Sequence, residues 1–177
     1  AETNTFLAAE GETDALSGSI SRAGEAILAI DLNDVETFND TRDGRLLTYL
    51  FETEFLPTAY LTTTVDVTGI SEMSVGAMST QTLTGELAIH AVRQVVNAEV
   101  MVIKTSDTTF SVNTIEPILV NSDSFDMSSG IEVLRTIAGL SSIGESVPVY
   151  LNLKFVINED ANATGVEMPE EPIAPSN

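Results

Sequence analysis

The stretch VPVYLNLKFVI, residues 147–157, decides the fold class that the sequence predicts. Apolar side chains occupy every second position from Val147 to Ile157, and the positions between them include Asn152 and Lys154. Successive side chains of a β-strand point to opposite faces, so a period of two indicates one dry face and one wetter face. The stretch therefore predicts a single long strand near the end of an all-β domain.

The same period of two recurs through most of the chain. Arg22-Ala23-Gly24 is typical of a hairpin turn, and Gly85 indicates a bend or a close approach of two backbones. Roughly seven strands joined by mostly short turns favour an antiparallel sandwich or barrel. Besides residues 147–157, the expected strands are residues 16–21, 26–32, 61–67, 83–89, 96–102, 110–112 and 118–120.

Two segments have helical spacing instead. Residues 42–50 follow the cluster Asn39-Asp40-Thr41, which supplies good N-caps. Residues 128–140 carry an apolar stripe that ends at Gly139, a residue type that often terminates helices. Both helices are short, and each is suited to closing the end of a barrel.

The composition excludes several classes of function. The chain has 177 residues, a length typical of one domain, and its 27 Asp and Glu against 7 Lys and Arg give a formal net charge of −20. Such a surface repels phosphate backbones and anionic membranes, so we expect no nucleic-acid partner. The lack of cysteine excludes disulfides, zinc–thiolate sites and thiol nucleophiles, and no apolar run is long enough for a spanning helix.

His90 is the single histidine and the first candidate for catalysis. A hydrolase triad would also need a nucleophile and an orienting acid, and no G-x-S-x-G elbow or comparable motif accompanies it. A lone histidine at a strand end is more often a hydrogen-bonding turn residue. We therefore expect no enzymatic activity and assign no catalytic residue.

Metal and sugar sites are also disfavoured. Acids at positions 31, 34, 36, 40 and 43 gather in one region, but Val35 breaks the spacing of a calcium-binding loop, so we expect a solvated face and no metal. Carbohydrate-binding modules stack sugars on exposed aromatic rings, above all tryptophan. This chain has no Trp and 3 Tyr.

The apolar residues leave two interpretations open. The aliphatic strands and 7 Phe can fill a solid core, which would suit a secreted carbohydrate-binding or protein-interaction module. A barrel of about eight strands can instead enclose one small ligand. Periodicity alone does not choose between them.

The order of three motifs resembles the YceI-like family. The first is IDLNDVETFNDTRDGRLLTYLFETEFLPTA at residues 30–59, where an Asp-rich turn leads into a short helix and then a Pro-Thr strand entry. The second, TGELAIHAVRQVVNAEV at residues 84–100, is similar to the family's G-x-L-x-x-H-G-V turn. The third runs from PILVNSDSFDM at residue 117 to Phe155. The resemblance spans residues 2–155.

This resemblance implies an extended antiparallel lipocalin-like β-barrel, with one or two short helices closing the end, over residues 1–157. It implies non-enzymatic binding, as a carrier or reservoir, of a polyisoprenoid lipid such as ubiquinone, another isoprenoid quinone or a polyprenyl phosphate, with no other cofactor. It also implies a structural role for His90. The expected lipid-binding side chains are Phe6, Leu28, Ile30, Leu46, Leu50, Phe51, Phe55, Leu61, Val65, Leu83, Leu87, Val100, Val102, Phe110, Phe125, Leu134, Ile137, Leu151, Leu153 and Phe155.

Two departures from the family pattern matter. Ala91 replaces the family's turn glycine, which disfavours a positive φ at this position. Relatives usually carry a further strand ahead of the segment that matches AETNTF, so the number of strands stays open.

The remaining expectations concern location and partners. Family members are typically exported, so we expect a periplasmic or secreted bacterial protein, with any signal peptide absent or removed. Residues 158–177 are acidic and contain proline, which predicts a tail or linker. Such a tail suggests further domains of a larger secreted protein as partners, with a homodimer as another possibility.

Overall fold

The computed structural model describes residues 6–8 and 15–157. Short 3-10 turns, Leu32–Asp34 and Asp123–Phe125, accompany the regular elements. In chain order these elements are β1 (Phe6–Ala8), β2 (Leu16–Ile20), β3 (Glu25–Asp31), α1 (Asp40–Tyr49), β4 (Thr58–Thr64), α2 (Val67–Ser71), β5 (Met78–Ile89), β6 (Val92–Lys104), β7 (Thr109–Thr114), β8 (Ile118–Asn121), α3 (Ser128–Ala138), β9 (Ser146–Val149) and β10 (Asn152–Ile157).

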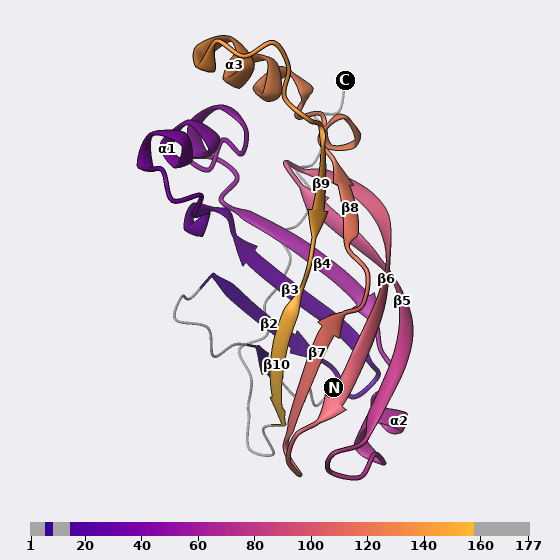
Figure 1. The fold of residues 1–177 in the computed structure, drawn as a ribbon. Coiled ribbons are helices and arrows are strands. Elements are labelled where there is room, and N and C mark those ends of the chain that lie inside the picture. The colour runs from indigo at the N-terminus through magenta and orange to yellow at the C-terminus, as the bar shows by residue number, and fades with distance from the viewer. Residues whose placement is uncertain (1–5, 9–14, 158–177) are drawn as a thin grey trace, which may run out of the picture.

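The main sheet curls into a barrel. Within the described residues its eight strands run in the order β1-β10-β7-β6-β5-β4-β3-β2, and every neighbouring pair is antiparallel. The two edge strands, β1 and β2, approach each other, so the sheet wraps around an interior (Figure 1). The antiparallel barrel expected from the sequence is confirmed, and the hairpin of β2 and β3 turns at Gly24, whose φ is +90°.

The turn between β5 and β6 corrects one expectation. His90 and Ala91 both have positive φ, 58° and 62°, so the substitution of alanine for the family's glycine does not remove the left-handed conformation. Two-residue hairpins of type I′ need positive φ at both central residues, because their twist then matches that of the strands. The long β5–β6 ladder, from Met78 opposite Ile103 to Ile89 opposite Val92, holds both residues in this unfavourable region.

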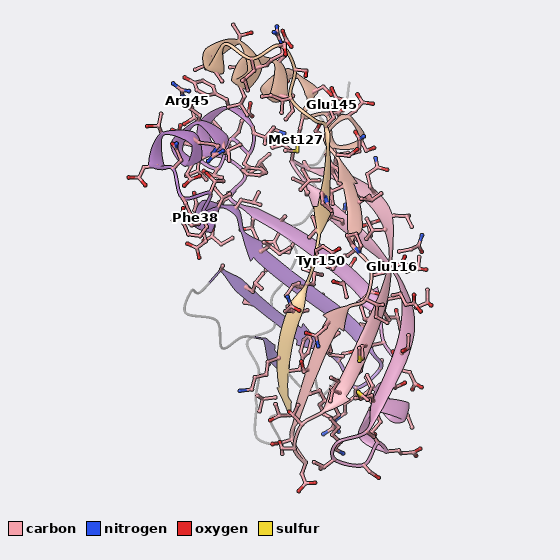
Figure 2. The ribbon with its side chains drawn as sticks, in the orientation of Figure 1. Phe38, Arg45, Glu116, Met127, Glu145 and Tyr150 are labelled. Atoms are coloured by element: carbon pink, nitrogen blue, oxygen red, sulfur yellow. The ribbon has the colours of Figure 1, made fainter. Side chains whose placement is uncertain are left out.

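The long strand expected at residues 147–157 is broken in two, which is a second correction. β10 pairs with β7, whereas β9 pairs with β8 in a separate two-stranded ribbon. Asn113 faces Asn152 and Ile118 faces Val149, so residues 114–117 lie opposite only Tyr150 and Leu151. Thr114 and Leu151 still bond to each other, which leaves residues 115–117 opposite Tyr150. This bulge breaks the ladder at a proline, Pro117, which has no N–H to donate. Figure 2 labels Tyr150 and Glu116, which lie at this break.

Two helices close one end of the barrel, as expected. α1 begins after Asn39, whose side chain accepts a hydrogen bond from Arg42 N–H, and α3 ends at Gly139 with φ +66°. The helices lie against each other, and a Cβ at Gly130 of α3 would stand only 2.3 Å from the carbonyl oxygen of Tyr49 (Figure 1). Only glycine permits this close approach.

A third helix, α2, lies at the opposite end of the barrel and was not expected (Figure 1). Its five residues, Val67–Ser71, begin after Asp66, whose side chain accepts a hydrogen bond from Gly69 N–H. In the described part of the chain, no helix is long and apolar enough to cross a membrane. The expected tail, residues 158–177, lies outside the described residues.

Candidate functional site

An apolar cavity lies in the middle of the barrel. Its empty volume, part of it open to solvent, is about 710 Å³. Its lining residues come from β2 to β8, from β10 and from the segments beside them. They are Ser19, Ile20, Ala26, Ile27, Leu28, Leu61, Thr63, Val65, Leu83, Gly85, Val96, Ala98, Val100, Val112, Thr114, Ile118, Leu151, Leu153 and Phe155.

Strand alternation explains why these walls are apolar. On β6, Val96, Ala98 and Val100 line the cavity, while Val95 points outward and is 70% exposed. On β5 the inward position between Leu83 and Leu87 is Gly85, where a Cβ would lie 2.6 Å from the Thr62 carbonyl oxygen. The close backbone approach expected at Gly85 is therefore confirmed.

A second apolar cavity continues the first toward α2. Its empty volume is about 310 Å³, and it shares Ile20, Val65, Val112 and Phe155 with the larger cavity. Val102 and Phe110 form its other wall together with Val67 and Ile70, the α2 residues that face it. We call the two cavities together the channel.

The opposite end of the channel is filled. Phe125 and Met127, which are 2% and 6% exposed, pack with Leu87 and contact Leu50 and Phe51 at the end of α1. Figure 2 shows Met127 below α3. Leu61 and Val96 contact this cluster and also line the larger cavity, so the cluster forms the end wall of the channel. A chain-like ligand therefore meets closely packed side chains at the α1–α3 end and α2 at the other.

The channel offers almost no polar chemistry. The described residues that line its two cavities include no charged side chain. The polar ones are Ser19, Thr63 and Thr114, and two of their hydroxyls already bond to backbone: Thr63 to the Thr84 carbonyl and Thr114 to Leu151 N–H. Such walls suit a long apolar molecule and give little to a sugar or a phosphate along their length.

The expected lipid-binding residues fall into groups. Most line the channel or its end wall, but Phe55 and Ile137 are 76% and 41% exposed and line neither cavity. Ile30 and Leu46 are half-buried on β3 and α1, Leu134 is buried on α3, and the Phe6 side chain lies outside the description. In the larger cavity are Leu28, Leu61, Val65, Leu83, Val100, Leu151, Leu153 and Phe155; in the smaller are Val102 and Phe110; in the end wall are Leu50, Phe51, Leu87 and Phe125.

Several lining residues were missed by the sequence reasoning, although a signal existed for some of them. Val96 and Ala98 share the parity of Val100 along one strand, so the period of two could have placed them on the same wall. Ile27 and Ala26 both line the cavity although they are adjacent, and no rule of alternation predicts that. Val67 and Ile70 were missed because α2 was not expected.

His90 lies in the β5–β6 turn and lines neither cavity. Its Nε2 is 3.5 Å from Glu52 Oε2, and no hydrogen bond to this nitrogen meets the usual geometry within the described residues. Glu52 also has a positive φ, 47°, so two strained backbone positions meet beside α1. This placement agrees with a turn residue.

Acidic residues of the cluster before α1 accept hydrogen bonds from residues nearby in the chain. Asp31 accepts a hydrogen bond from Asn33 N–H, and Asp43 accepts hydrogen bonds from the backbone and hydroxyl of Thr37. The hydroxyl of Thr37 is the main reason why the pKa of Asp43 lies below its usual value. Among the residues that the structure describes, no three potential metal ligands come together.

Comparison with known proteins identifies the family. The model of the YceI-like domain matches residues 2–155, nearly the whole of the described chain. The chain belongs to the YceI-like family. No curated protein matches it.

Solved structures of the YceI-like fold agree with the barrel seen here. A polyisoprenoid-binding domain from Saccharophagus degradans, implicated in plant cell wall breakdown, is 34% identical, with a TM-score of 0.79 over 87% of this chain and 92% of that one. BcnA of Burkholderia cenocepacia is 14% identical (TM-score 0.57, 85% and 93% covered). The Campylobacter jejuni YCEI protein is 16% identical (TM-score 0.53, 90% and 89% covered). The last two comparisons concern the fold alone.

Proposed function

We propose that this protein binds a polyisoprenoid lipid, an isoprenoid quinone or a polyprenyl phosphate, in the channel as a non-enzymatic carrier or reservoir. The observation that carries the proposal is the apolar channel, whose described lining residues include no charge. The 34% identical neighbour with the same fold is a polyisoprenoid-binding domain, which supports the same class of ligand. The solid-core alternative is disfavoured because a packed interior leaves no such cavities.

The energetics of burial support this assignment. One five-carbon isoprene unit transferred from water to an apolar wall gains roughly 3–4 kcal/mol, at about 0.8 kcal/mol for each methylene-sized group. Several units would offset the roughly 4–15 kcal/mol that association costs in lost freedom of motion. Tight binding thus requires few polar contacts along the tail.

Mass spectrometry of an organic extract from the purified protein tests this function. A prenyl lipid present at near-stoichiometric amount is the expected result. The matched control is a variant with the channel filled, Ala98→Phe, because Ala98 lines the larger cavity and the new ring would take the place of the tail. A clean extract from the wild type, followed by failed reconstitution with quinones and prenyl phosphates, would overturn the proposal.

A further inference from the structure

Lys104 is a cation that points toward the interior of the barrel. It ends β6 at the α2 end, two residues beyond Val102 and four beyond Val100, and therefore shares their inward face. Both valines line the channel, and Lys104 itself is only 8% exposed. The chain has one other lysine, Lys154, which is exposed on the outer face of β10.

The described residues around the Lys104 ammonium meet only part of its need for hydrogen-bond acceptors and a counter-charge. Nζ donates one hydrogen bond to the Ser71 carbonyl oxygen, at 3.1 Å, where α2 ends. It also lies 5.5 Å from the centre of the Phe110 ring, which lines the smaller cavity. An ammonium has three N–H donors, and no carboxylate among the described residues lies within ion-pairing distance of this one.

A buried charge without a counter-charge is unfavourable, and folded proteins normally pair it. Lys104 itself lines neither cavity, but Val102 and Phe110 beside it line the smaller one, whose described walls are apolar. The flexible four-carbon stem of a lysine allows the ammonium to turn from Ser71 toward the cavity that Phe110 lines. An anion that carries an apolar tail would supply the counter-charge that the described residues do not.

We propose that Lys104 binds the phosphate of a polyprenyl phosphate at the α2 end of the channel. The head group then lies beside α2, and the tail runs toward Phe125 and Met127 at the closed end. This inference rests on the proposed function and deepens it, because it names the phosphate-bearing isoprenoid as the ligand and Lys104 as the residue that selects it.

A purely structural role is the competing explanation. The bond from Lys104 to the Ser71 carbonyl fastens α2 to β6, so loss of the lysine could loosen the end of the barrel. Such a loss would weaken the binding of every lipid to the same degree. A role in head-group selection would weaken the binding of phosphates alone.

The experiment compares geranylgeranyl phosphate with geranylgeraniol, which has the same tail and no charge. Both are titrated by calorimetry against delipidated wild type, Lys104→Met and Lys154→Met. The second variant removes the same charge from the outer face of the barrel and so controls for net charge. A charge-assisted hydrogen bond to a buried ammonium predicts that the wild type binds the phosphate roughly 10- to 100-fold more tightly than the alcohol.

The expected result is that Lys104→Met removes this preference while the affinity for the alcohol stays within about twofold, and that Lys154→Met keeps it. Equal losses for both lipids in Lys104→Met would overturn the inference in favour of a structural role. Equal affinities of the wild type for the two lipids would also overturn it, even if Lys104→Met did not fold. In both of those cases the proposed function survives, whereas a wild type that binds neither lipid contradicts the proposed function itself.

Discussion

Replacement of Leu153 by tryptophan separates a ligand channel from a solid core. Leu153 lies on β10 opposite Val112 of β7, and both side chains line the larger cavity. A tryptophan ring at this position points into the middle of the channel. It therefore competes directly with a bound tail, whereas in a solid core it would displace packed neighbours.

A ligand channel and a solid core predict different effects of Leu153→Trp on lipid affinity and on the free energy of unfolding. If the ring takes the place of one isoprene unit, the lost burial of roughly 3–4 kcal/mol lowers affinity for long tails by roughly 100- to 1000-fold. The free energy of unfolding of the lipid-free protein then changes little, because the ring enters empty space. In a solid core, overpacking costs roughly 1–3 kcal/mol of stability and there is no affinity to lose.

The assay titrates quinones of increasing tail length against both proteins, alongside urea unfolding of the lipid-free forms. Leu119→Trp is the control, because it makes the same substitution on β8 at a side chain that is 71% exposed. It should leave binding and stability nearly unchanged. If Leu153→Trp is strongly destabilised and no tail length binds the wild type, the interior is packed solid and the reasoning fails.

Three further predictions concern the turn and the tail. Ala91→Gly should raise the free energy of unfolding by roughly 0.5–1 kcal/mol in a urea titration, because the φ of 62° suits glycine; a decrease would mean that the turn is not strained. His90→Asn should leave lipid affinity within about twofold, since a turn residue contributes at most one hydrogen bond and asparagine tolerates positive φ; lost binding in a folded variant would place His90 in the site. Deletion of residues 161–177 should change the Tm little, because acidic, proline-containing segments bury little surface, and a large fall would move the domain boundary.

The sequence predicted those parts of the fold that depend on local rules. Alternation placed β2, β3, β5 and β6 within a few residues, and the caps at Asn39 and Gly139 placed both closing helices. These predictions succeed because the alternation of side chains in a strand and the capping of a helix depend only on residues close together in the chain. Much of the wall of the channel follows from the same parity once the strands are known, although the adjacent residues Ala26 and Ile27 do not obey it.

The remaining features of the fold depend on contacts between residues far apart in the chain, which a local sequence pattern does not reveal. Val147 to Ile157 alternates without interruption, yet the strand breaks because Pro117 and its neighbours bulge on the partner strands. Ala91 adopts a positive φ because two long strands impose it. Phe55 was expected inside from hydrophobicity alone, and its position in the loop after α1 leaves it exposed.

The pairing of β1 with β10 has a consequence for how the molecule reaches its native state. Phe6 pairs with Ile157, so the two ends of the described chain must meet before the sheet can close, and such non-local pairing is entropically costly and slow. The β5–β6 hairpin, by contrast, can zip outward from its turn without waiting for any other strand. The three-residue strand β1 should therefore be the last to dock and the first to detach, and its amide hydrogens should exchange with solvent faster than those at the centre of β6.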